Sequence, residues 1–200
     1  MWKQTGLIAA ILTIVAISMN AGCGHASGQD LDDQELALQL ASENTRDAAV
    51  KRVVALGSAK LPLLLLWAQE PPPDVFEYEL KIGLAEVFGS LKTTAAIPFL
   101  IRNISIEKSS SGNPWSRAPE YIEATFPAVG ALIRIGPPGA RAVIQASEEP
   151  MSHRDRLASV FVVSRVAGVA EAKEYLWQAR AEANLQAQYA TEGLRAWGMQ

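Results

Sequence analysis

The sequence predicts an all-α protein, arranged as a solenoid (a superhelix) of about four helix pairs with capping helices at its ends. Three observations lead to this expectation. Apolar side chains recur at helical spacing along most of the chain after residue 33. A proline inside an apolar run recurs 36 residues apart, at Pro62 and Pro98. Four glycines follow helical segments at separations of 32, 47 and 32 residues, namely Gly57, Gly89, Gly136 and Gly168. A period of roughly 30 to 50 residues with two helices per period is typical of solenoids.

The first 22 residues have the pattern of a secretion signal peptide. Lys3 supplies a positive charge, and Gly6 to Met19 is an uncharged apolar run of 14 residues. A membrane-spanning helix needs about 20 residues, whereas a signal peptide needs about 7 to 15. We therefore expect an exported protein whose fold begins after this segment.

Cys23 is the predicted lipidation site. It follows Asn20-Ala21-Gly22, which resembles the bacterial lipobox, although the lipobox usually has leucine where Asn20 stands. The resemblance implies that Cys23 becomes the acylated N-terminus, carrying lipid such as palmitate. It is the only cysteine, so it has no internal disulfide partner. Cleavage after Ala26 and retention as an uncleaved anchor are the alternatives.

The segment after Cys23 is expected to act as a flexible tether, 23–32, followed by one repeat domain, 33–200. Residues 33–42 form a capping helix that buries Leu36 and Leu40. The first pair is expected at 44–56 and 62–67, with Asn44 as N-cap and Gly57 as the stop. Its outward face should carry the charged residues Arg46, Asp47, Lys51 and Arg52.

Three further pairs and a closing half-unit follow. The second pair covers 75–91 and 95–106, and its buried stripe is Phe76, Leu80, Leu84, Val87 and Leu91. The third covers 121–135, kinked at Pro127, and 140–147. The fourth begins at a Ser152/Asp155 capping box and continues through a second helix at 170–177. The closing helix is expected at 185–197.

A family resemblance rests on RDAAVKRVVALG at Arg46–Gly57, followed by AKLPLLL. This stretch resembles the HEAT-like repeats, in particular the short bacterial form named after phycobilisome lyases. The likeness extends over about residues 44–198, with repeats of unequal length that share few identical side chains. It implies a fold used by scaffolds, adaptors and a few enzymes.

The sequence offers no motif for metal, cofactor or nucleophilic chemistry. Its two histidines are His25 in the tether and His153 at a helix start. Metal-binding enzymes of helical-repeat type place His-Glu pairs on successive repeats, and this chain has no such dipeptide. His153 and Asp155 are expected to form an exposed first helical turn. Without Lys3 the chain has 17 basic against 21 acidic residues, a net charge of −4 that argues against nucleic acid.

The segment 108–119 is an insert, longer than the usual helix–helix link of about 2 to 8 residues. It carries Trp115 and Arg117, residue types enriched in binding hot spots, so both are candidate partner contacts. The alternative is that Trp115 folds back over an apolar edge of the third pair.

These observations together predict a membrane-anchored scaffold or adaptor that is not an enzyme. It would mediate protein–protein interaction with an unknown protein of the bacterial cell envelope. One alternative is a ligand-handling or lyase-like enzyme with a groove formed by Trp67, Arg102 and Trp177; another is a purely structural periplasmic module. Acidic, Arg or Tyr side chains clustered in one concave pocket would favour the enzyme. A shallow apolar surface at the insert would favour the scaffold.

Overall fold

The computed structural model describes residues 27–108, 114–146, 151–168 and 170–174. Within these ranges the chain is helical and contains no strand, which confirms the all-α class. The nine α-helices in this part of the chain are α1 (Ser27–Leu40), α2 (Glu43–Leu56), α3 (Leu61–Trp67), α4 (Glu77–Leu91), α5 (Ile97–Arg102), α6 (Pro119–Thr125), α7 (Pro127–Ile135), α8 (Pro137–Ala146) and α9 (His153–Val166).

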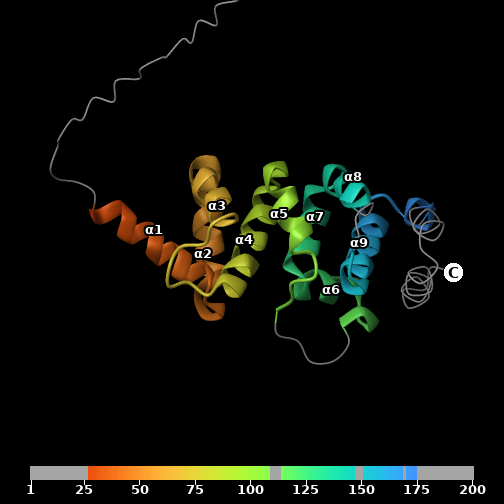
Figure 1. Ribbon diagram of the computed structural model, residues 1–200, viewed down its shortest axis with the longest axis horizontal. Coiled ribbons are helices and arrows are strands. Elements are labelled where there is room, and N and C mark those ends of the chain that lie inside the picture. Colours follow the sequence, from red (N-terminus) through yellow and green to blue (C-terminus); the bar gives the residue numbers. More distant parts are fainter. Residues whose placement is uncertain (1–26, 109–113, 147–150, 169, 175–200) are drawn as a thin grey trace, which may run out of the picture.

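The helices follow one another along the long axis of the molecule (Figure 1). Helices α2, α4, α7 and α9 form a row in which each contacts the next. Helices α3, α5 and α8 lie along one side of this row, and α5 contacts both α7 and α8. Helix α1 packs on α2 and α4 at one end.

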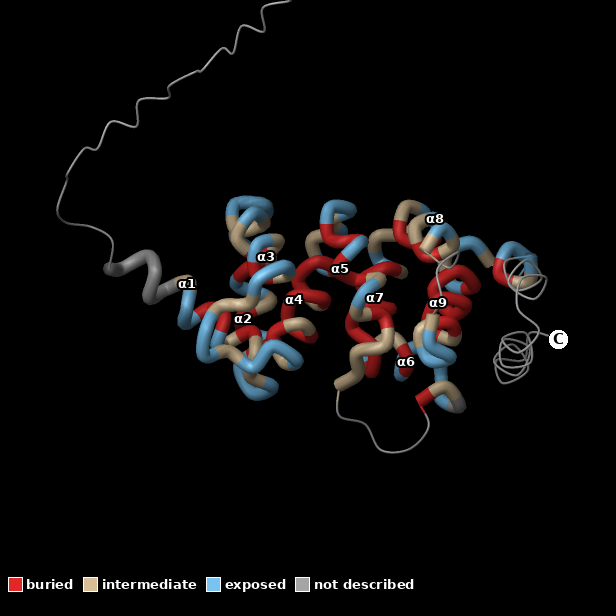
Figure 2. The backbone as a smooth tube through the Cα atoms, viewed as in Figure 1, coloured by how far each residue is buried: buried red, intermediate tan, exposed pale blue. Residues whose placement is uncertain are grey.

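A continuous apolar core extends through the row (Figure 2). Its middle is α4, which lies between α2 and α7 and therefore buries residues on most of its circumference. Phe88 of α4 is fully buried and meets Phe99 of α5 edge to face, with ring centroids 5.6 Å apart. Such a pair adds about 1 kcal/mol beyond the area it buries.

Several of the predicted helix ends are confirmed. Gly57 and Gly136 follow α2 and α7 with φ of 65° and 82°, a region where side chains are strained. Pro62 lies in the first turn of α3, where its missing N–H costs nothing. Leu36 and Leu40 are buried, as expected for a capping helix.

The predicted start of α2 is wrong, and so is the expected exposure of one of its arginines. Ser42, not Asn44, precedes the helix, and its carbonyl accepts a hydrogen bond from the Arg46 amide at 2.8 Å. Arg46 is 4% exposed, because the end of α1 and the start of α4 cover it.

Gly89 does not end a helix, contrary to the prediction. It lies inside α4, which ends at Leu91, and Lys92 adopts the left-handed conformation at φ 50°. A Cβ on Gly89 would lie 2.7 Å from Cα of Ala131 in α7. The glycine therefore lets two neighbouring helix backbones approach closely.

Two further expectations about the middle of the chain are corrected. Phe76 precedes α4 and is 82% exposed, so it does not belong to the buried stripe. The predicted helix 121–135 is two helices, α6 and α7, separated at Phe126 instead of merely kinked at Pro127. Pro127 starts α7 because it lacks the N–H that would continue α6.

Both ends of the chain extend beyond the described residues. Helix α1 begins at Ser27, so the predicted tether is helical in its second half, 27–32. The signal segment 1–22 and the closing helix 185–197 fall outside the described ranges. The predicted helix 170–177 is helical over 170–174, and its last three residues also fall outside. In the described part, none of the helices is both long enough and apolar enough to span a bilayer.

The capping box of α9 is confirmed and gives a prediction. The Ser152 hydroxyl accepts a hydrogen bond from the Asp155 amide at 3.1 Å and donates to the Asp155 carboxylate at 2.6 Å. We expect Ser152→Ala to lower the free energy of unfolding by about 1 kcal/mol. Urea denaturation followed by circular dichroism measures this. The control is Ser90→Ala, whose hydroxyl only binds back to a carbonyl within α4, and an equal loss in both variants would contradict the prediction.

Candidate functional site

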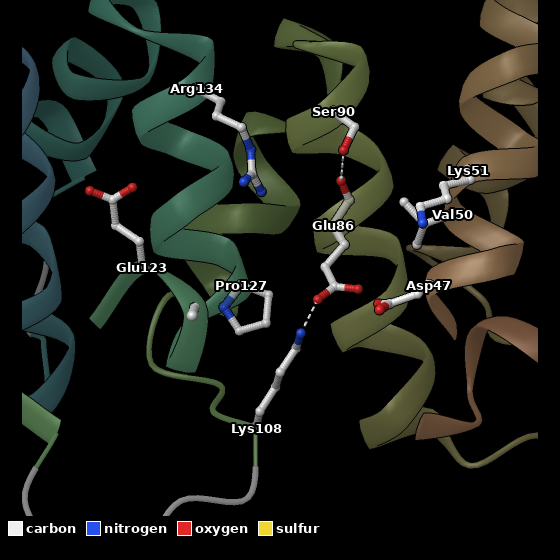
Figure 3. A pocket seen from close by; sticks show the side chains of 10 residues that line it. Asp47, Val50, Lys51, Glu86, Ser90, Lys108, Glu123, Pro127 and Arg134 are labelled. Atoms are coloured by element: carbon white, nitrogen blue, oxygen red, sulfur yellow. Dashed lines mark hydrogen bonds and ion pairs between the residues drawn. The ribbon is translucent and has the colours of Figure 1, made fainter. Parts of the chain in front are cut away.

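A charged groove crosses the middle of the row of helices, with a volume of about 390 Å³ (Figure 3). Helix α4 lies between its two walls, which come from α2 and from α6 and α7. The residues that line it are Asp47, Val50 and Lys51 of α2; Glu86 and Ser90 of α4; Lys108 of the insert; Glu123 and Ala124 of α6; and Pro127 and Arg134 of α7.

Helical periodicity places these side chains on one surface. Asp47 and Lys51 are one turn apart on α2, and Glu86 and Ser90 are one turn apart on α4. Between Ile82 and Gly89 the other residues of α4 are apolar and buried, so in this part of the helix the polar pair marks the strip that reaches solvent. The groove is thus formed by the outer edges of helices whose other faces make the core.

The break between α6 and α7 shapes the second wall. Because Pro127 has no N–H, it cannot continue the hydrogen-bond ladder to the Glu123 carbonyl. This carbonyl lies against Gly130, where a Cβ would be 2.9 Å away. The carbonyl of Thr125, two residues further along, accepts a hydrogen bond from the Lys108 amide at 2.8 Å. That bond fixes Lys108 at the edge of the groove.

Two ion pairs neutralise part of the groove. The Lys108 ammonium pairs with Glu86, and the Arg165 guanidinium donates to Glu123 at 3.0 Å. In the described part of the structure, the side chains of Asp47, Lys51 and Arg134 make no hydrogen bond or ion pair. The groove therefore offers two unpaired cations and one unpaired carboxylate.

Arg134 reaches the groove across the line where α4 and α7 meet. Its Nη2 lies 2.8 Å from the position that a Cβ of Gly89 would occupy, and 3.7 Å from that of Gly130. The absence of side chains at these two glycines leaves the space that the guanidinium fills. Figure 3 shows the side chain directed from α7 toward α4.

The two residues predicted as partner contacts in the insert lie in different surroundings. Trp115 is half-buried; it stacks on Phe126 with ring centroids 4.6 Å apart and meets Phe161 edge to face at 6.5 Å. This is the fold-back geometry that the sequence left open as the alternative. Arg117 is exposed, with its guanidinium 5.6 Å from the centre of the Tyr121 ring.

The alternative enzyme groove, which would need Trp67 and Arg102 on one exposed surface with Trp177, is not formed by the first two of these residues. Trp67 is 6% exposed and belongs to the core. Arg102 lines a different hollow of about 540 Å³, together with Gln69, Lys81 and Asn103. Trp177 and the predicted lipidation site Cys23 lie outside the described residues.

His153 and Asp155 occupy the first turn of α9, where Asp155 is occupied by the capping box. Among the described residues, no three His, Cys, Asp or Glu side chains lie close enough together to hold a metal ion.

Sequence reasoning missed Glu86, Glu123 and Arg134 as residues of one site. Each is a charged position in a helix that is otherwise rich in apolar residues. Such a pattern predicts that the charged side of each helix faces solvent. It does not predict which charged sides of different helices lie next to one another. Comparison of the chain with protein-family models, with curated proteins and with solved structures gives no match.

Proposed function

We propose that this chain is an exported, lipid-anchored adaptor of the bacterial cell envelope, built as an α-solenoid. The order of helix contacts supports the solenoid. Each helix of the row α2, α4, α7, α9 packs on the next helix of the row, and α3, α5 and α8 line one side of it. A stack in which each pair contacts its neighbours is the arrangement of HEAT-like repeats.

The proposal of export and anchoring rests on the N-terminal sequence. An apolar run of 14 residues after Lys3 is followed by Ala21-Gly22-Cys23. A single acyl chain gives weak, reversible membrane binding, whereas two or more chains hold a protein stably. Lipid on Cys23 would hold the helical domain at a membrane surface.

The observation that carries the binding role is the charged groove of about 390 Å³ across α2, α4 and α6–α7. Open grooves over successive repeats are the binding surfaces of solenoid proteins. The unpaired charges of Asp47, Lys51 and Arg134 give such a surface polar contacts that fix a partner's register. We place the partner contact there and keep exposed Arg117 as a second contact.

A second candidate function is favoured by one observation. Three acidic residues, two lysines and one arginine line the same concave site. Clustered charges of this kind are what a ligand-handling protein on this fold would present. The volume lies in the range of small-molecule pockets, about 300 to 1,000 Å³.

The anchoring part predicts the behaviour of Cys23→Ser. We expect the intact protein to incorporate labelled palmitate and to sediment with membranes, and we expect the variant to lose the label. Mass spectrometry of the mature N-terminus is the second measurement. A mature chain that begins at Ser27 in both proteins would contradict lipidation and establish cleavage after Ala26. A native protein that remains in the membrane with its first 22 residues intact would establish an uncleaved anchor.

Site-specific photo-crosslinking tests the adaptor role in native membranes. A photoreactive residue replaces Ser90 in the groove, Arg117 at the insert, or exposed Arg141 of α8 as the control position. We expect one envelope protein to be captured from Ser90 and not from Arg141. Capture from Arg117 would extend the contact to the insert. Absence of any protein product from Ser90, together with a small molecule retained there, would replace the adaptor with the ligand-handling function.

A further inference from the structure

We propose that Arg134 is the anion receptor of the groove and binds one carboxylate or phosphate group of the ligand. The rest of that ligand lies across α4 toward Lys51. This inference deepens the proposed binding function by naming the chemical group that the groove recognises. It rests on the placement of the guanidinium, on its lack of a partner, and on the charges around it.

The guanidinium of exposed Arg134 lies against the two glycines at the contact of α4 and α7. It lies where a side chain of Gly89 would be, with Nη2 2.8 Å from that Cβ position, and it passes Gly130 at 3.7 Å. Both glycines are buried inside helices that pack on each other. The missing side chains of Gly89 and Gly130 leave room for the guanidinium, and for an anion that it binds, at the edge of the groove.

The guanidinium is also free to bind. It carries five N–H donors in a planar fork that matches the oxygens of a carboxylate or phosphate. Within the described residues Arg134 donates to no carboxylate, because Glu86 is paired with Lys108 and Glu123 with Arg165. The acids that line the groove are therefore engaged by other cations, and Arg134 keeps its donors for a ligand.

The surrounding charges restrict the ligand. Asp47, Glu86 and Glu123 line the same groove, so a ligand with several negative charges meets repulsion beyond its first anionic group. Lys51, on the opposite wall, can pair with the far side of that group or with a second polar atom. The fitting ligand thus has one carboxylate or phosphate and a neutral or cationic remainder. A small acid and the C-terminus of a peptide share this chemistry.

The test is isothermal titration calorimetry on the full-length protein in detergent micelles. The probes are inorganic phosphate, N-acetylalanine, which has a carboxylate, and N-acetylalaninamide, which has the same shape without the charge. A short acetylated peptide with a free C-terminus separates the peptide source from the small acid. We expect binding of phosphate and the carboxylates, no binding of the amide, and weaker binding as salt is raised.

The variants are Arg134→Gln, Arg134→Lys and the matched control Arg141→Gln, which removes an exposed arginine of α8 outside the groove. Loss of a charge-assisted hydrogen-bonded contact weakens binding by roughly tenfold to a hundredfold, so Arg134→Gln should do so. Arg134→Lys should fall between this variant and the native protein, because it keeps the charge and loses the fork. Arg141→Gln should bind as the native protein does. Thermal unfolding of each variant checks that the fold is intact.

Equal affinity of the native protein and folded Arg134→Gln would overturn the proposal, and so would equal binding of acid and amide or no binding of any anion. These outcomes are separable from the adaptor role. If crosslinking from Ser90 captures an envelope protein while the anions fail, the adaptor stands and the receptor assignment falls. If the anions bind and no protein is captured, the receptor stands and the adaptor falls.

Discussion

Gly89→Val should lower the free energy of unfolding by about 3 kcal/mol, the upper part of the range for overpacking a tight interior. The Cβ would lie 2.7 Å from Cα and 2.8 Å from Cβ of Ala131, and these atoms belong to the backbone of α7 or are fixed to it. Relief requires α4 and α7 to move apart. In a helix that is exposed to solvent, replacing glycine raises the free energy of unfolding by up to about 1 kcal/mol. A loss of stability at Gly89 would therefore show that α4 and α7 are in close contact there.

Urea denaturation of the two proteins measures this difference, with Ser90→Val as the matched control. Ser90 is the next residue on α4 and is exposed, so valine there reports only the small cost of a β-branched residue in a helix. We expect the control to change stability by less than about 1 kcal/mol. A loss at Gly89 no larger than the loss at Ser90 would contradict the close approach of α4 and α7.

Arg46→Ala is expected to cost about 2 kcal/mol or more, because it removes both polar contacts of a buried charge. The Nε of Arg46 donates to the Leu40 carbonyl at the end of α1 at 3.1 Å, and Nη2 donates to Glu79 of α4 at 2.5 Å. The Leu40 carbonyl is among the last of α1, which have no partner inside the helix. In the variant, the Leu40 carbonyl loses this donor, and the packing of the aliphatic part of the arginine side chain is lost as well.

Chemical denaturation of Arg46→Ala, Glu79→Ala and the double variant separates these contributions. Glu79 itself is 41% exposed on its side chain, but Glu79→Ala leaves the buried Arg46 guanidinium without its carboxylate, so this variant should also lose about 2 kcal/mol. Lys51→Ala is the control, since Lys51 is an exposed, unpaired cation on the same helix. A loss in Arg46→Ala as small as that in Lys51→Ala would show that the buried contacts do not contribute to stability.

Local signals in the sequence predict most helices of this fold but not how they meet. The sequence predicts the helix ends at Gly57 and Gly136, because the tolerance of a positive φ is a property of the single residue. Gly89 fits the same 32-residue spacing from Gly57, but it lies inside α4 and allows α7 to approach. The sequence does not reveal this, because the contacting residue Ala131 is 42 residues away in the chain. Arg46 lies on the outward side of its own helix pattern, yet it is buried by contacts with α1 and with Glu79, 33 residues later.

The candidate site could be predicted only in part for the same reason. The sequence places Asp47 and Lys51 together on the outward face of α2, and both line the groove. Joining them to Glu86 and Arg134 requires the packing of three helices. The sequence allows two interpretations of Trp115, because composition does not predict whether an aromatic residue in a long connection packs on the core or contacts a partner.

The attachment of the insert has a consequence for engineering the protein. The Lys108 amide binds the Thr125 carbonyl, and Trp115 stacks on the adjacent Phe126. Lys108 and Trp115 are thus attached at neighbouring points of the helical body, and neither contact requires a fixed length of chain between these two residues. Closing a longer segment costs only about 0.6 kcal/mol for each doubling of its length. An affinity tag or a fluorescent label introduced between residues 109 and 113 can therefore be carried without displacing α6, α7 or the groove beside them.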